Sequence, residues 1–419
     1  SERRGECMFP LAGTAHTHTD RRPQRSRAVT AVQSKFGVQQ LASRLVNARF
    51  VACDSSEHHV EQSQPPGLAA RNAPQALRAL HTKCVGRVEA GRAVEDREIE
   101  KIIKKQEEIG LQLATDGEFR RSWWHYDFLA KLVGVELVSV AQGLQFKGTQ
   151  TKAEGLHVHG KIDFDAGHPM IDHFRFLKSV AKATPKMTIP SPTALHFRGG
   201  RKAIEMSAYP TMEPFFDDLG KAYGKAVRAF GEAGCTYLQL DEVFVAYLCD
   251  DAQRQMLRDR GDDPDKLLYV YKDLVNAACA GKSPDMTISM HLCRGNFRST
   301  WMAQGGYERV ADVLFNQMNV DAYFMEYDSE RAGGFEPLRF LPKGKQVVLG
   351  VMTSKTGQLE SKDQLKRRIE EASKFAPLDQ LCLSPQCGFA STEEGNLLAE
   401  DEQWAKLARC VEVAKEVWG

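Results

Sequence analysis

The chain has 419 residues, of which 42% are hydrophobic and 26% are charged, and its formal net charge is +1. This composition is typical of globular proteins. The near-neutral charge argues against nucleic acid as the main partner, because phosphate binding usually leaves a basic excess. Apolar runs such as Tyr237–Leu240 are far shorter than the roughly 20 residues that cross a bilayer, so no membrane span is expected.

The first 50 residues differ from the rest of the chain, since they hold nine Lys or Arg residues against three acidic ones. Acid-poor, Arg- and Ser-containing amino termini are typical of transit peptides for a mitochondrion or plastid. An untargeted, disordered extension is the alternative. We therefore expect two parts, an extension over residues 1–50 and a catalytic domain over residues 51–419.

From residue 51 onward, short apolar runs alternate with longer segments of helical period. The expected strands are Gln112–Thr115, Met187–Ile189, Thr236–Leu240, Thr287–His291, Ala322–Met325, Gln346–Val351 and Gln380–Leu383. A further strand near Val51 or His59 would make eight. The expected helices are Asp96–Ile109, Glu213–Ala233, Pro264–Ala280, Gly306–Phe315, Ser361–Phe375 and Glu402–Val417.

The alternation of strands and helices predicts parallel βα units and an α/β fold. Eight such units over about 360 residues favour a (β/α)₈ TIM barrel that forms a single catalytic domain. A doubly wound sheet is the alternative, but no Gly-rich phosphate-binding sequence follows an early strand.

The ten cysteines do not form the pattern of a disulfide framework. Cys293 and Cys387 have polar or glycine-containing surroundings. Free thiols indicate a reducing compartment such as the cytoplasm. Most other cysteines lie singly in apolar stretches and are interpreted as small core residues: Cys235, Cys249, Cys279 and Cys382.

Polar residues end most of the expected strands. In a parallel barrel all these ends meet on the face that carries active sites, so residues far apart in the chain become neighbours. The polar strand ends are Thr115–Glu118, Asp241–Glu242, His291–Cys293, Glu326–Asp328 and Ser384–Gly388.

His291 and Cys293 end the same expected strand, and residues two apart on a strand point to the same side. Together with Cys387 they offer the imidazole and thiolate ligands of a catalytic zinc site with one open position. Glu326 is expected to fill the fourth position when substrate is absent. The alternative is that His291 and Cys293 are core residues and Glu326 is a surface carboxylate.

A zinc ion held by two thiolates and an imidazole suits a substrate thiol, whose pKa it lowers. Water activation for hydrolysis suits such an ion less well. The resulting thiolate would attack an electrophilic carbon, so the sequence predicts alkyl transfer, most simply methyl transfer.

Glu118 and Asp241 place negative charge on the same face, where we expect them to bind the ammonium group of an amino-acid substrate, as candidate catalytic residues. Trp123 and Trp124 offer a flat wall for a planar donor, although buried structural aromatics are the alternative. Two neighbouring basic residues are expected either to bind a carboxylate or to brace the barrel mouth by ion pairs: Arg120 and Arg121.

At these residues the chain resembles the cobalamin-independent methionine synthase family, in particular its short, single-barrel members. The resemblance covers residues 58–419, and the His-x-Cys, Glu and Cys-Gly set at strand ends is its most specific signature. The matching segments are Thr115–Phe128 (TDGEFRRSWWHYDF), Thr188–Gly200 (TIPSPTALHFRGG), Tyr237–Glu242 (YLQLDE), His291–Asn296 (HLCRGN), Phe324–Asp328 (FMEYD) and Leu383–Gly388 (LSPQCG).

The resemblance implies homocysteine as the acceptor thiol, with Glu118 and Asp241 near its amino group. It also implies a methyl donor of the 5-methyltetrahydrofolate type and methionine as the product. The implied zinc ligands are His291, Cys293, Glu326 and Cys387.

Three features depart from the family pattern. Full-length members carry a second barrel that helps to hold the folate, and we do not expect it in a chain of this length. The family's strand-seven loop has a histidine suited to proton delivery, whereas the matching stretch here is Val351–Lys355. Short members bind the substrate carboxylate with a His-Val-Gly-Ser turn; here the turn is His59–Ser63, with Glu61 at the glycine position and Ser63 as the hydroxyl expected to stand in.

Other functions are compatible with the sequence. The donor of a methionine-forming enzyme could instead be a corrinoid-bound methyl group or a methylated sulfur compound. A related zinc alkyltransferase would join another thiol, such as coenzyme M, to an epoxide, but a sulfonate thiol without an amine has no use for Glu118 and Asp241. A barrel that has lost turnover and acts by binding is favoured only by the altered His59–Ser63 turn.

Overall fold

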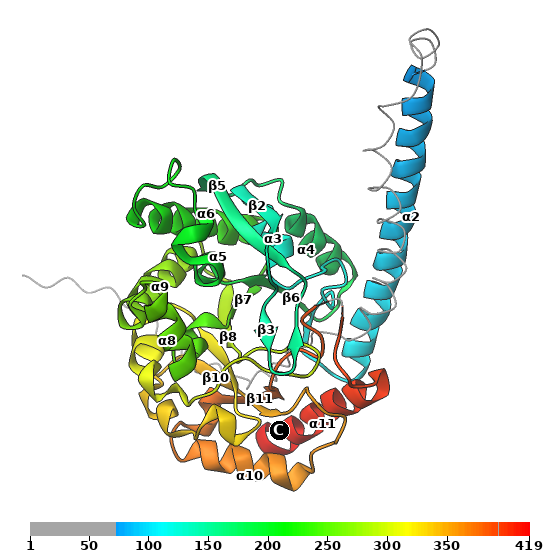
Figure 1. Cartoon of the computed structure of the whole chain (residues 1–419). Helices are drawn as coiled ribbons and strands as arrows, with labels where there is room; N and C mark the ends of the chain where they lie inside the picture. The colour runs from blue at the N-terminus through cyan, green and yellow to red at the C-terminus, as the bar shows by residue number, and fades with distance from the viewer. Residues whose placement is uncertain (1–72, 393) are drawn as a thin grey trace, which may run out of the picture.

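The computed structural model describes residues 73–392 and 394–419. At its centre, seven parallel strands form a curled sheet, and most of the helices lie outside it (Figure 1). In spatial order the strands are β1 (Leu113–Ala114), β6 (Thr184–Pro190), β7 (Tyr237–Glu242), β8 (Thr287–Leu292), β9 (Ala322–Glu326), β10 (Gln346–Met352) and β11 (Leu381–Pro385).

Helices connect successive strands of this sheet, as parallel strands require. Within the described residues the connecting helices are α3 (Tyr126–Leu129), α4 (Pro169–Val180), α5 (Thr193–Gly199), α6 (Glu213–Glu232), α7 (Phe244–Tyr247), α8 (Asp251–Asp259), α9 (Pro264–Cys279) and α10 (Lys362–Ser373), while α2 (Ala73–Glu108) precedes β1 and α11 (Glu400–Trp418) follows β11. Antiparallel pairs are inserted after β1: β2 (Val133–Ser139) with β5 (Glu154–Asp163), and β3 (Gln145–Phe146) with β4 (Thr149–Gln150).

The central strands are rich in apolar residues because both faces of the sheet are buried. The register is parallel throughout, so that Asp241 on β7 lies opposite His291 on β8. All seven strands expected from residue 112 onward are present, and the prediction of an α/β TIM-barrel fold is confirmed.

β1 and β11 are the two ends of the sheet within the described residues. The loops that follow these two strands meet: Trp123 pairs with Thr392, and the Trp124 N–H donates to the Ser391 carbonyl over 3.2 Å. The sheet therefore curls so that the carboxyl-terminal ends of β1 and β11 approach one another. The extension over residues 1–50, the further strand expected near Val51 or His59, and Ser63 all lie outside the described residues.

Two separate groups of buried apolar side chains hold this architecture together. The larger one fills the space between the sheet and the helices. The smaller one comes from five strands of the sheet, which is the pattern of a layer inside a barrel. It consists of Leu113, Tyr237, Phe324, Val348 and Cys382.

Four of the expected helices agree with α6, α9, α10 and α11 to within two residues at each end. The helix expected over Asp96–Ile109 is the end of the much longer α2, which projects past the barrel in Figure 1. No described helix is both long enough and apolar enough to cross a membrane.

The single helix expected over Gly306–Phe315 is wrong. These residues form a 3₁₀ turn, Tyr307–Arg309, and a π-helical turn that begins at Val313. The reason is Tyr307, which is fully buried: its hydroxyl accepts from the Glu326 N–H at 3.0 Å and from the Arg294 guanidinium at 2.7 Å. These tertiary hydrogen bonds outweigh the local helical preference.

Replacing Asp321 should destabilise the barrel at the face opposite the strand ends described above. Its carboxylate accepts from the Ile288 N–H at 2.7 Å and from the Lys282 ammonium at 2.6 and 2.7 Å, which ties the start of β9 to the start of β8. Asp321→Ala leaves that N–H without its partner, so the free energy of unfolding should fall by about 1–3 kcal/mol in urea titrations.

Asp172→Ala is the matched control. Its carboxylate pairs with Arg175 at 2.8 Å on the surface, with both side chains more than half exposed, so its loss should cost less than about 0.5 kcal/mol. Equal stability of the Asp321 and Asp172 variants would contradict the role assigned to Asp321.

Candidate functional site

Three potential metal ligands meet at the carboxyl-terminal ends of β8 and β11. One ligand atom each from His291, Cys293 and Cys387 lies within 4.8 Å of the others, and the two Sγ atoms are 3.6 Å apart. Two sulfurs bound to one zinc ion at about 2.3 Å in a tetrahedral shell are about 3.8 Å apart. The sulfur spacing therefore fits a shared metal ion.

The orientation of His291 points to the same use. Its Nδ1 is 3.2 Å from the Phe324 carbonyl, which can only accept, so Nδ1 carries the proton and Nε2 has the lone pair. Nε2 is buried and has no hydrogen-bond partner among the described residues. A buried polar atom of this kind is expected to have a partner, and metal-binding histidines are commonly held by such a carbonyl.

The two cysteines are buried as free thiols in the described chain. The hydrogen bond with Cys387, together with burial, raises the pKa of Cys293 well above its usual value. Two adjacent thiols resist ionisation because their thiolates would repel each other, and a cation between them removes that cost. The donor set therefore fits a thiophilic cation.

The loops that carry these ligands are tied to one another. The Asn296 side-chain amide donates to the Gly388 carbonyl at 2.8 Å, and Asn396 donates to Asn296 at 3.2 Å. Gly295 has a φ of +92°, and its N–H donates to Cys293 Sγ at 3.2 Å. A side chain at Gly295 would press on the Tyr247 hydroxyl at 3.1 Å, so the turn after Cys293 requires glycine.

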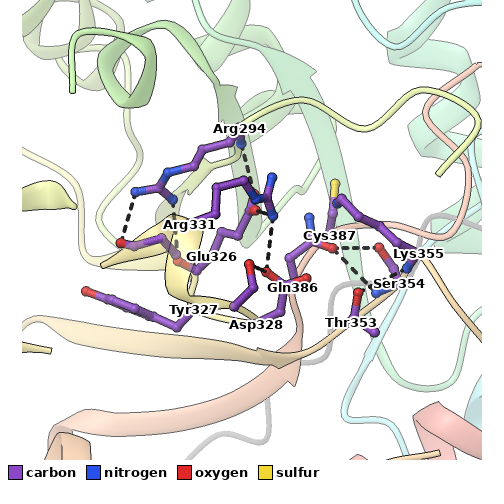
Figure 2. Close-up of polar contacts among 12 residues, drawn as sticks. Arg294, Glu326, Tyr327, Asp328, Arg331, Thr353, Ser354, Lys355, Gln386 and Cys387 are labelled. Carbon is purple, nitrogen blue, oxygen red and sulfur yellow. Dashed lines mark hydrogen bonds and ion pairs between the residues drawn. The ribbon is translucent and has the colours of Figure 1, made fainter. Parts of the chain in front are cut away.

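Glu326 ends β9 beside this group but does not lie within it. Its carboxylate is fully buried and accepts from the Arg294 N–H at 2.9 Å and from the Arg331 guanidinium (Figure 2). Burial raises the pKa of Glu326, but the charges of Lys355, Arg331 and Arg294 outweigh burial and hold it below the usual value. Glu326 is therefore ionised, and its expected place in the fourth metal position stays a prediction.

Lys355 lies in the loop after β10, which the sequence singled out only as a departure from a family pattern. Its ammonium nitrogen is buried and has no hydrogen-bond partner among the described residues. Its charge acts on Glu326, Asp328 and Cys293. Figure 2 shows this lysine on the same loop as Thr353 and Ser354, next to Cys387.

A small cavity of about 30 Å³ opens onto the metal-binding group. Trp123, Trp124 and Asp241 line it, as their predicted substrate-binding roles require, but Glu118 does not. Several further lining residues were not singled out from the sequence, because none of them ends an expected strand: Phe146, Arg198, Tyr247, Asn296 and Phe297.

Aromatic side chains form one part of the cavity wall. Trp123 stacks on Phe297 with ring centroids 5.9 Å apart, and Trp124 stacks on Phe244 at 6.4 Å. The β3–β4 hairpin adds Phe146, which is 5.3 Å from Phe297. The wall is apolar and tightly packed, so it excludes water from the thiol pair.

The two acidic candidates differ in their surroundings. Asp241 is 1% exposed, lines the cavity and accepts from the Gln239 amide at 2.7 Å. Glu118 has a φ of +59°, which is strained for a non-glycine residue, and lies 3.5 Å from the Arg121 guanidinium. Arg120 instead pairs with Asp96 and Glu95 on α2, so it braces the barrel mouth.

Comparison with known proteins identifies the family. Residues 67–416 match the family described as cobalamin-independent synthase, catalytic domain. The Bacillus subtilis protein YxjH is 50% identical over 356 residues, which cover 84% of this chain and 93% of that protein. The chain belongs to this methyltransferase family.

A solved structure from Listeria monocytogenes, provisionally described as a vitamin-B12 independent methionine synthase, superposes with a TM-score of 0.62 at 42% identity, covering 78% of this chain and 88% of that one. A Bacillus velezensis 5-methyltetrahydropteroyltriglutamate–homocysteine methyltransferase is 24% identical over 328 residues, 76% of this chain but 38% of that protein. The family resemblance seen in the sequence is thus confirmed.

Cys387→Ala should abolish tight metal binding, because the remaining two donors cannot complete a tetrahedral thiolate site. Metal content after dialysis, measured by mass spectrometry, should fall from about one ion per chain to near zero.

The matched control is Cys382→Ala, on β11, the strand that precedes Cys387. Cys382 is also buried but belongs to the interior layer, so its loss should lower thermal stability and leave metal content unchanged. Equal metal content in wild type and the Cys387 variant would exclude the site.

Proposed function

We propose that this protein is a zinc-dependent methyltransferase that converts homocysteine to methionine. The observation that carries the proposal is the convergence of His291, Cys293 and Cys387 in a cavity at the strand ends of a cobalamin-independent synthase barrel. Active sites of TIM barrels occupy this face.

Zinc is the metal that the donor set supports best. Two thiolates and one imidazole are soft or borderline ligands, which disfavour magnesium and calcium. His291 Nε2, Cys293 Sγ and Cys387 Sγ would hold the ion, and Glu326 would occupy the fourth position when substrate is absent. When bound, the ion supplies Lewis acidity that lowers the pKa of a substrate thiol.

The charges around the site support an anionic reactant. Two ligand thiolates and a substrate thiolate exceed the charge of one divalent cation by one unit. Lys355 supplies a buried positive charge on this side of the barrel, and Arg331 neutralises Glu326. These side chains would keep the charge balanced while a thiolate is present.

The substrate-binding residues are proposed to act as follows. Asp241 binds the ammonium group of homocysteine within the cavity, and Glu118 adds negative charge from the end of β1. Trp123 and Trp124 form the apolar wall against which the methyl donor lies. Ser63, outside the described residues, is proposed to contact the substrate carboxylate.

The transfer itself balances without a further reactant. The substrate sulfur forms a bond to the methyl carbon, the bond from that carbon to the donor atom breaks, and its electron pair leaves with the donor. The aromatic wall keeps water from competing for the methyl group. A 5-methyltetrahydrofolate-type donor is proposed from the activity for which the Bacillus velezensis relative is named.

The Asp241 side chain should distinguish an amino-acid thiol from a thiol without an amine, such as the sulfonate thiol coenzyme M. Asp241→Asn removes the charge that binds the ammonium group, so the KM for homocysteine should rise roughly 10- to 100-fold. The KM for 4-sulfanylbutanoate, which lacks the amine, should change less than about twofold. Steady-state methionine or thioether formation with the zinc-loaded protein measures both values.

Asp250→Asn is the control, since Asp250 is also buried and lies beyond β7, where it caps α8 through the Ala252 and Gln253 N–H groups. Asparagine retains this cap, so both KM values should stay near wild type. If wild-type protein forms no methionine with any methyl donor, the proposed function is wrong; if the Asp241 variant weakens both thiols alike, only the amine assignment fails.

A further inference from the structure

The cavity next to the metal-binding group is lined by one acidic and one basic side chain besides the metal-binding residues. Among its lining residues, Asp241 carries the negative charge and Arg198 the positive one, while the other lining residues are aromatic, small or uncharged polar groups apart from the ligands themselves. Burying an unpaired positive charge is costly, so the arginine is expected to meet an opposite charge on a ligand.

Arg198 has the properties of a side chain that awaits an anion. It lies on α5, directly after β6, and is half-buried. Its Nε is buried without a hydrogen-bond partner, and no carboxylate of the described chain forms an ion pair with it. Nearby arginines differ: Arg201 donates to the carbonyls of Ile204 and Tyr209 at 2.9 and 2.7 Å.

The position of Arg198 is fixed by its neighbours. Its guanidinium lies 5.1 Å from the centre of the Phe244 ring, and Phe244 also stacks on Phe197 at 4.6 Å. Glu242 holds this platform, because its carboxylate accepts from the Phe244 and Val245 N–H groups at 2.7 and 2.9 Å. A cation resting on an aromatic face keeps its N–H edge available for a planar anion.

Arg198 also lies on the side of the cavity that faces the metal ligands. Burial raises the pKa of Tyr247, the Arg198 charge opposes this rise, and Cys293, Glu326 and Cys387 add to it. Tyr247 thus lies within electrostatic reach of both the arginine and the thiol pair.

The residues that would hold an amino-acid thiol come from three neighbouring strands or from the segments that follow them. β6, β7 and β8 are hydrogen-bonded neighbours, and adjacent strands are about 4.8 Å apart. Asp241 and His291 lie at the ends of β7 and β8, Cys293 follows β8, and Arg198 reaches the same cavity from α5, which follows β6. With the thiol at the end of β8, the α-carbon and its two charged groups therefore face Asp241 and Arg198.

We propose that Arg198 binds the carboxylate of the thiol substrate and so, with Asp241, restricts the acceptor to zwitterionic amino-acid thiols. This inference rests on the proposed function, because the thiol must bind at the metal-binding group. Arg198 is a specificity residue in this assignment and does not act on the reacting sulfur.

The test compares two thiols that differ only in the carboxylate, homocysteine and 3-aminopropane-1-thiol. Calorimetric titration of the zinc-loaded full chain should show that Arg198→Met weakens homocysteine binding roughly 10- to 100-fold. The same substitution should change the affinity for 3-aminopropane-1-thiol less than about twofold. Arg198→Lys should restore part of the homocysteine affinity, because a lysine keeps the charge but not the forked geometry.

Arg201→Met is the matched control, since Arg201 is close in sequence but does not line the cavity; its homocysteine affinity should match wild type. Equal weakening of both thiols by Arg198→Met would indicate a merely structural role and overturn the proposal, as would no change in either. A homocysteine loss in Ser63→Ala but not in Arg198→Met would assign the carboxylate to Ser63 instead. Absence of homocysteine binding to wild type would instead refute the proposed function.

Discussion

The structure depends on bringing Cys293 and Cys387 together across 94 residues of chain to a sulfur–sulfur distance of 3.6 Å. Barrel closure alone does not achieve this, because strand ends set positions only to within a few ångströms. Gly350 allows the last step: a side chain there would lie 2.7 Å from the Met325 carbonyl and 2.8 Å from Gln386 Cα. Because Gly350 has no side chain, β9, β10 and the start of the loop that carries Cys387 pack in direct backbone contact.

The close approach of these strands also brings several charged side chains together. Glu326 and Asp328 are buried beside the thiol pair, and the basic residues Arg294, Arg331 and Lys355 are buried or nearly so with them. Such a group is stable only if its charges balance, since unpaired buried ions are costly. A divalent cation with two thiolates adds no net charge to this balance. The three basic side chains therefore neutralise the two carboxylates and leave one positive charge for a substrate thiolate.

Much of this arrangement could be predicted from the sequence because it depends on strand ends. Short apolar runs predicted the seven strands. The polar residues at or after the ends of these runs indicated the site residues before any distance was known: His291, Cys293, Glu326, Asp241 and Cys387. Residues on connecting loops could not be found this way. Arg198, Phe146 and Phe297 reach the cavity through the short α5 helix, an inserted hairpin and a turn, none of which has a periodic pattern. The 3₁₀ turn at Tyr307 was missed for a related reason, since a single tertiary hydrogen-bond centre overrides local preference there.

The small volume of the cavity determines how strongly its charged side chains act on a ligand. The cavity of about 30 Å³ beside the thiol pair holds few waters. Solvent therefore screens the charges of Asp241 and Arg198 only weakly. A ligand that brings a carboxylate balances the charge of Arg198, whereas a simple alkanethiol leaves that arginine without an anion. Discrimination of this kind arises from the penalty on the wrong ligand as much as from attraction to the right one. The aromatic wall strengthens the effect, because it lowers the local dielectric constant.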